Sequence, residues 1–197
     1  MHVKVIGFAI LVHIVSTYYV HKIGSDHYHP HQAIKRNLDK VWDVCHKYFP
    51  NVHHLDYLAN IIFLIPLIIV ICSGSPKRIL DDVLLYFPII LIIRSLMIFV
   101  TILPKHKRCD SGKLTWKSFV VGHCYDKIFS GHFSLFLLVT LSMLRYNVIN
   151  SSTTIALNLL NALIILLTRS HYTTDIIIAF FITQSVYNNC YSMNIFS

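Results

Sequence analysis

Long apolar runs separated by short polar stretches dominate the pattern of this 197-residue chain. Six runs of roughly 16 to 22 residues carry few charges, and such lengths are close to what a helix needs to cross about 30 Å of hydrocarbon. The strict alternation of apolar and polar residues that closed membrane strands require is missing. We therefore expect six helical membrane spans, at about residues 3–20, 57–72, 82–103, 128–146, 153–168 and 172–187.

Composition supports an integral membrane protein. The chain is 55% hydrophobic and only 13% charged, which is unusual for a soluble domain of this size. The formal net charge is +8, but the basic residues are scattered between apolar runs, so we expect no nucleic-acid partner. No small-residue cleavage site follows the first run, which is expected to stay as a span. We predict one all-α, polytopic membrane domain over residues 1–197, and a homo-oligomer is left open.

Three ionisable residues stand where predicted spans begin. His132 lies at the start of the fourth span, and His171 and Asp175 lie at the start of the sixth. Ionisable groups are costly at such positions and usually carry function. With six spans, the connections after the first, third and fifth share one membrane face. The three side chains are therefore predicted to meet near one surface and to form a composite site.

The spacing of His171 and Asp175 suggests acid–base chemistry. Residues at i and i+4 share one face of a helix, where a carboxylate can accept a proton from one imidazole nitrogen. That contact leaves the other nitrogen as a nucleophile or base. His132 would supply a second imidazole, suited to protonating a leaving group.

Candidate phosphate-binding groups surround these histidines. Ser130 and Gly131 precede His132 at a helix start, where backbone N–H groups and the helix dipole favour a phosphate oxygen. Arg94 is predicted roughly 12 Å below the same surface, and a guanidinium matches phosphate geometry, as does that of Arg169. Alternatively, Arg94 snorkels or pairs with an internal carboxylate, and Arg169 is an interfacial anchor.

The polar segment 21–56 carries histidines that invite a metal hypothesis: His21, His27, His29, His31, His46, His53 and His54. No regular ligand spacing with cysteine follows, so we expect no metal and no cofactor. Cys109 and Cys124 flank one predicted loop and would pair only if that loop faces an oxidising compartment.

At these motifs the sequence resembles the sphingomyelin synthase family, within the lipid phosphate phosphatase superfamily. Residues 124–133, CYDKIFSGHF, resemble the pattern Cys-Gly-Asp-x-x-x-Ser-Gly-His-Thr, with Tyr125 and Phe133 as departures. Residues 171–175, HYTTD, resemble His-Tyr-Thr-x-Asp, and residues 94–104 resemble an Arg…Thr-x-Leu-Pro segment. The family's Pro-Leu-Pro-Asp motif is missing before the second span.

The resemblance implies a six-helix bundle of the lipid phosphate phosphatase type that transfers a phospholipid headgroup to ceramide. His171 would attack the phosphorus of a phosphatidylcholine- or phosphatidylethanolamine-like donor, Asp175 would orient it, and His132 would protonate the departing diacylglycerol. Asp126 falls inside the first motif and is assigned to the phosphate site with Arg94, Ser130, Gly131 and Arg169. The partners would be these lipids and the bilayer.

Two alternatives remain beside the transferase. A lipid phosphate phosphatase would give the intermediate to water, but the Lys-x6-Arg-Pro motif that holds a phosphomonoester dianion in such enzymes does not occur here. A transporter or scaffold would use the buried charges without catalysis. Family topology implies a lumenal or exterior site in Golgi, endoplasmic reticulum or plasma membrane, although the loop charges point to the cytosolic side.

Overall fold

A computed structural model of the chain describes residues 2–32, 41–55, 57–103 and 127–192. All of its regular elements in these ranges are helical, as the sequence predicts. They are α1 (His2–Gln32), α2 (Val44–Tyr48), the short 3₁₀ helix η1 (His53–Leu55), α3 (Leu58–Cys72), α4 (Pro76–Val100), α6 (Gly131–Arg145), α7 (Ser151–Leu167) and α8 (Thr173–Ser192).

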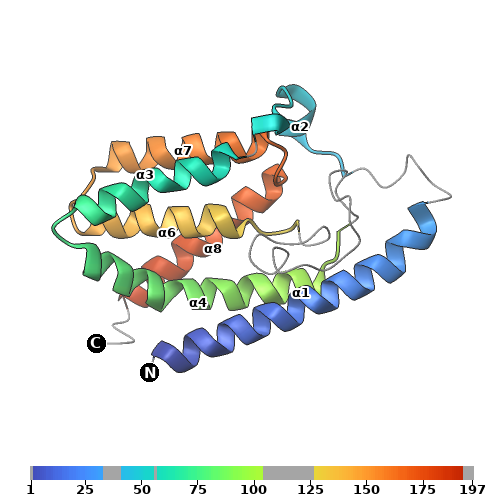
Figure 1. Ribbon diagram of the computed structural model, residues 1–197, viewed down its shortest axis with the longest axis horizontal. Helices are drawn as coiled ribbons and strands as arrows, with labels where there is room; N and C mark the ends of the chain where they lie inside the picture. Colours follow the sequence, from blue (N-terminus) through green and yellow to red (C-terminus); the bar gives the residue numbers. More distant parts are fainter. Residues whose placement is uncertain (1, 33–40, 56, 104–126, 193–197) are drawn as a thin grey trace.

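Helix α6 is the centre of the bundle. It contacts α3, α4, α7 and α8, whereas α1 packs along the outer side of α4. Figure 1 shows the turns that join α3 to α4 and α6 to α7 at one end of the bundle. The end of α7, the starts of α6 and α8, and α2 gather at the other end, which we call the α2 end. The ends of helices far apart in sequence thus meet on one side, as span parity predicts.

Helix length and composition fit a membrane protein. Within the residues that the structure describes, two helical stretches are long and apolar enough to cross a membrane, Val3–Asp26 and Pro76–Val100. Three further helices, α3, α6 and α7, are apolar but shorter. These lengths support membrane association, and the full set of six spans stays a prediction.

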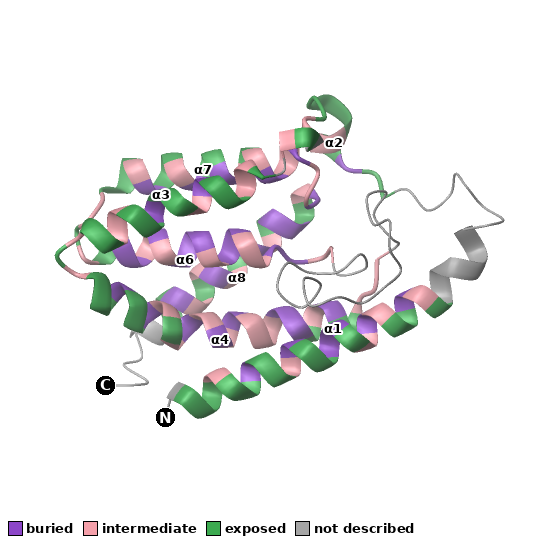
Figure 2. Ribbon diagram, viewed as in Figure 1, coloured by how far each residue is buried: buried purple, intermediate pink, exposed green. Residues whose placement is uncertain are grey.

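The distribution of side chains gives a second, independent reason for a membrane. Exposed residues lie along the outer faces of the helices (Figure 2). Large apolar side chains are among them, including Leu64, Ile68, Leu159 and Phe181. The helix interfaces instead bury small and polar residues: Ser134, Thr140, Ser142, Asn158, Asn161, Ala179 and Thr183. Small and hydroxyl-bearing residues allow close helix approach and hydrogen bonds between helices in lipid, where apolar burial gives no driving force.

Three predicted boundaries are wrong, and one of them is the end of the sixth predicted span, because α8 continues past residue 187 to Ser192. The first helix does not end at residue 20 but continues to Gln32, because polarity alone does not stop a helix. The third predicted span begins at Pro76 rather than at residue 82, since proline is favoured in the first helical turn, and it ends at Val100. The predicted polar segment 21–56 therefore contains the end of α1, α2 and η1.

An ion pair fastens α4 to α6 at the end of the bundle opposite α2. Arg145 Nη1 donates to both carboxylate oxygens of Asp82, at 3.3 and 3.2 Å. The hydroxyl of Tyr146 donates to the same carboxylate at 3.3 Å. Asp82 is buried, so the guanidinium offsets the desolvation of its charge.

Candidate active site

The contact between His171 and Asp175 is present, but a shared helix face does not produce it. Asp175 Oδ2 lies 3.1 Å from His171 Nδ1, and both side chains are buried. His171 precedes α8, which begins at Thr173, so the pair is formed by the turn before the helix. Asp175 also accepts the Tyr172 N–H at 2.9 Å, as an acidic residue in the first turn does in a capping box. Since an ionised carboxylate only accepts, Nδ1 carries a proton, and the neutral form of the ring then has its lone pair on Nε2.

After α7 the chain reverses direction at a residue whose backbone is in the left-handed helical conformation. Arg169 has φ 59°, and the N–H groups of Arg169 and Ser170 donate to Leu166 and Ile165 carbonyls at 3.1 Å each. This is the usual way to satisfy the last carbonyls of a helix, although a non-glycine residue costs about 1 kcal/mol there. The Arg169 guanidinium donates to the Phe49 carbonyl at 2.8 Å. The structure thus gives Arg169 a contact within the protein, and its predicted phosphate role stays a prediction.

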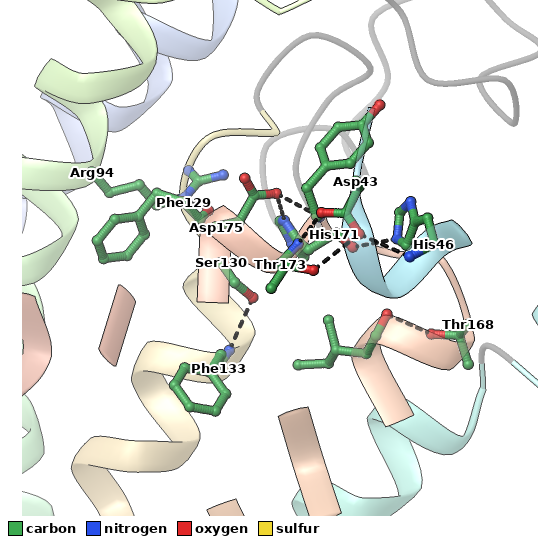
Figure 3. A network of polar contacts seen from close by, with 12 residues as sticks. Asp43, His46, Arg94, Phe129, Ser130, Phe133, Thr168, His171, Thr173 and Asp175 are labelled. Atoms are coloured by element: carbon green, nitrogen blue, oxygen red, sulfur yellow. Dashed lines mark hydrogen bonds and ion pairs between the residues drawn. The ribbon is translucent and has the colours of Figure 1, made fainter. Parts of the chain in front are cut away.

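Two residues that the motif reasoning left out of the site, Asp43 and His46, cover the same turn. Asp43 accepts the backbone N–H and the hydroxyl of Thr173, at 2.7 and 2.9 Å. His46 Nε2 lies 3.0 Å from the His171 carbonyl, and its ring centroid lies 5.2 Å from that of Tyr172. In Figure 3 these side chains lie on one side of the His171–Asp175 pair, and Arg94 and Phe129 lie on the other.

The charge states of Asp43 and His46 follow from their surroundings. Burial alone would raise the pKa of Asp43, but hydrogen bonds from the His46 N–H and from Thr173 bring it below its usual value. Burial lowers the pKa of His46, and the positive charge of Arg169 lowers it further, against the opposing effect of Asp43. Near neutral pH, Asp43 is therefore ionised and His46 neutral.

The start of α6 forms the opposite wall of the site. Ser130 is fully buried at the N-cap, and its hydroxyl oxygen accepts the Phe133 N–H at 3.3 Å. Arg94 lies directly against Gly131, because a methyl group on the glycine would lie 3.5 Å from Arg94 Nε. His132, in the first turn of α6, lies within electrostatic range of Lys127 and Arg94. Positive charge therefore gathers around a helix N-terminus, which favours an anion.

Arg94 is held from two sides. Its Nε donates to the Phe129 carbonyl at 3.4 Å, and its Nη1 lies 3.2 Å from His13 Nδ1 in α1. A guanidinium only donates, so His13 accepts through Nδ1 and carries its proton on Nε2. Sequence reasoning missed His13, although a buried histidine inside an apolar span was a usable signal. The alternative that Arg94 snorkels to the surface is wrong, since its side chain is buried here.

An apolar groove of about 720 Å³ runs between α6, α7 and α8. Phe133 and Ile176 line it, and each follows directly on a candidate site residue, His132 and Asp175. Leu144 and Ser151 line it too, close to the turn at the far end of α6. The groove therefore extends from the depth of the site toward the other surface, and its wall suits an alkyl chain.

Several predicted residues fall outside the described ranges. Asp126, which was assigned to the phosphate site, is one of them. So are Tyr125 and the cysteines Cys109 and Cys124. The predicted site residues within the described ranges are Arg94, Ser130, Gly131, His132, Arg169, His171 and Asp175. The structure adds His13, Asp43 and His46 as residues that contact them or the turn between α7 and α8.

Comparison with protein families agrees with the motif reasoning at a coarse level. Residues 123–193 match the family model described as PAP2 superfamily C-terminal. The matched range covers fewer than half of the 197 residues, and it includes His132, His171 and Asp175 but not Arg94 or the α2 segment. No curated protein matches the chain. The match supports a phosphatase or phosphotransferase that acts on lipid phosphates, and the narrower resemblance to sphingomyelin synthases stays a prediction.

Proposed function

We propose that this protein is a membrane phosphotransferase that moves a phosphate-bearing headgroup from a glycerophospholipid to the hydroxyl of a ceramide. The observation that carries the proposal is the His171–Asp175 pair, in which the carboxylate binds Nδ1 and leaves Nε2 with its lone pair. Arg94 of α4 lies against Gly131 at the start of α6, where a phosphate would meet a guanidinium and a helix N-terminus. The apolar groove beside the site suits the chains of a lipid substrate.

The reaction would proceed in two displacements at phosphorus. His171 Nε2 attacks the donor phosphorus, a P–N bond forms, and the P–O bond to diacylglycerol breaks while His132 gives that oxygen a proton. The ceramide hydroxyl then attacks the phosphohistidine, His132 takes its proton, and the P–N bond breaks. Asp175 keeps the proton on His171 Nδ1 throughout. Arg94 would offset the charge that grows on the phosphoryl oxygens.

The test is an assay of the purified protein in lipid vesicles with headgroup-labelled phosphatidylcholine or phosphatidylethanolamine and with ceramide. We expect a labelled sphingophospholipid that disappears in His171→Ala and persists in His54→Ala, which alters an exposed histidine. Rapid quenching should trap an acid-labile, base-stable label on His171. In His132→Ala, a donor whose leaving group needs no proton should still label His171.

The acceptor decides between the proposal and its alternatives. Label released into water from a phosphomonoester lipid, with none transferred to ceramide, would identify a phosphatase. Absence of any turnover and of any trapped label in the wild-type protein would leave the transporter or scaffold. Either result would overturn the transferase.

A further inference from the structure

The segment 43–52, which contains α2, lies across the turn that joins α7 to α8. Besides the contacts of Asp43 and His46, the Val52 N–H donates to the Leu167 carbonyl at 3.1 Å. The Arg169 guanidinium meets the Phe49 carbonyl from the other direction. The segment thus contacts the turn on both sides of His171, although more than a hundred residues separate the two in sequence.

Asp43 is buried against the turn, unlike an ordinary surface aspartate. It is 7% exposed, while its neighbours Trp42 and Val44 are 70% and 43% exposed. Its Oδ1 caps α2 by accepting the His46 N–H at 2.9 Å and also accepts the Thr173 hydroxyl. Its Oδ2 accepts the Thr173 N–H, which is one of the first N–H groups of α8 and has no partner within that helix. One carboxylate therefore caps two helices.

His46 adds a contact to the residue before. A backbone carbonyl only accepts, so His46 Nε2 carries a proton and donates it to the His171 carbonyl. The His46 ring also lies beside Tyr172. Three consecutive residues of the turn, from His171 to Thr173, are each touched by a side chain of the α2 segment. Figure 3 shows Asp43 and His46 beside His171 and Thr173.

We infer that Asp43 and His46 are positioning residues that hold the His171 turn in its reactive orientation. They bind the His171 carbonyl and the Thr173 N–H, two backbone groups in the stretch between His171 and Asp175, so a shift of the turn would move Nε2 away from the phosphorus. A misplacement of about 1 Å can cost on the order of 100-fold in rate. The inference that the orientation is reactive rests on the proposed function, whereas the holding of the turn does not.

Hydrogen exchange tests the holding without any activity. Exchange of peptides that cover residues 168–176 should be compared in wild type, Asp43→Ala and Thr173→Val, with Asp81→Asn as the control. Asp81 is an exposed aspartate of α4 at the opposite end of the bundle. We expect exchange to rise roughly 10-fold in Asp43→Ala and less in Thr173→Val, which keeps the N–H contact. Peptides from the middle of α6 should not change, which separates a loosened turn from general unfolding.

Kinetics then test the positioning role. Asp43→Ala should lower kcat roughly 10- to 100-fold with KM within about threefold, because the substrate-binding walls are untouched. Thr173→Ser keeps the hydroxyl and should retain wild-type rates, whereas Thr173→Val should lose several-fold. Unchanged exchange in Asp43→Ala would overturn the inference, as would faster exchange with unchanged kcat. A wild-type protein without turnover would refute the proposed function alone, because the exchange result would still stand.

Discussion

At each end of the bundle a buried aspartate contacts a basic side chain, Asp82 at the far end and Asp175 at the α2 end, and the two basic side chains differ in kind. The Asp82 carboxylate accepts two hydrogen bonds from the Arg145 guanidinium and one from the Tyr146 hydroxyl. Asp175 receives an imidazole nitrogen and a backbone N–H. A guanidinium stays charged at all relevant pH values, so the positive charge in the first contact is permanent. An imidazole held at one nitrogen keeps a lone pair on the other, so the second contact creates a reactive atom.

The comparison separates a structural from a chemical use of the same residue type. Removing the Asp82 carboxylate should lower the stability of the protein and leave turnover nearly unchanged. Removing the Asp175 carboxylate should lower turnover far more than stability.

Asp175→Asn should nearly abolish activity. The amide oxygen can still accept the Tyr172 N–H, but the NH₂ group then donates to His171 Nδ1 and moves the imidazole proton to Nε2. The nucleophilic lone pair is lost, and kcat should fall on the order of 10³- to 10⁴-fold. Initial rates of headgroup transfer measure this, with Asp81→Asn as the exposed control. A variant that retains more than a tenth of wild-type kcat would contradict the role given to Asp175.

Asp82→Ala should destabilise the protein and leave the site alone. Arg145 would keep a partly buried charge without its carboxylate, which should lower the free energy of unfolding by about 2–3 kcal/mol. Thermal unfolding in detergent measures the loss, and turnover per folded molecule should stay within about twofold. The double variant Asp82→Leu/Arg145→Leu should recover most of the stability, because it removes both charges. A large loss of kcat with unchanged unfolding would reverse the assignment of the two aspartates.

Short-range patterns predicted a good part of this arrangement. The apolar runs predicted the helices, span parity predicted which helix ends meet, and the spacing of His171 and Asp175 predicted their contact. The reason for that contact was nevertheless wrong, because α8 begins at Thr173 and the turn, not the helix, brings the pair together. The i, i+4 rule gave the right distance since a capping residue also reaches back over one turn.

The remaining parts depend on contacts that no local pattern carries. Asp43 reaches Thr173 across 130 positions, and His13 reaches Arg94 across 81. In the sequence alone, Asp43 is one aspartate of a polar segment and His13 is an isolated histidine in an apolar run. Tertiary packing decides the role of both residues. The three-dimensional structure is needed to see that Asp43 caps the start of α8. His13 still gave a hint, because an ionisable side chain in an apolar span needs a partner.

His13→Ala should weaken the site moderately. Arg94 would lose an acceptor that fixes its guanidinium, worth about 1 kcal/mol, so kcat/KM should fall roughly fivefold. His13→Gln offers an amide oxygen in place of Nδ1 and should recover part of the loss. Ile14→Ala alters an exposed neighbour on α1 and serves as the control. Equal losses in the alanine and glutamine variants would indicate that His13 packs against α4 without orienting Arg94.

The smallest effect is a pH dependence of the α2 segment that distinguishes its two titrating residues. The pKa of His46 is lowered in the folded protein, so the unfolded chain binds more protons between the folded value and about 6.5. The free energy of unfolding should therefore fall as pH drops below about 6.5. Asp43 has a lowered pKa as well, so its contribution is complete above about 3.9 and is lost only as pH falls through the folded value.

The pH ranges in which His46 and Asp43 titrate are separate, so a substitution of His46 alone isolates the effect of the histidine. His46→Gln can keep an N–H donor for the His171 carbonyl but cannot titrate. We expect hydrogen exchange of residues 168–176 to accelerate between pH 7 and 5 more in wild type than in His46→Gln. The difference in opening free energy should be less than about 1 kcal/mol, because solvent screens the partly exposed ring from the charges of Asp43, Arg169 and Asp175. Every other histidine is common to both proteins, so the difference isolates His46. An identical pH response in the two proteins would mean that protonation of His46 does not loosen the turn, and the hydrogen bond to the His171 carbonyl would then hold in both charge states.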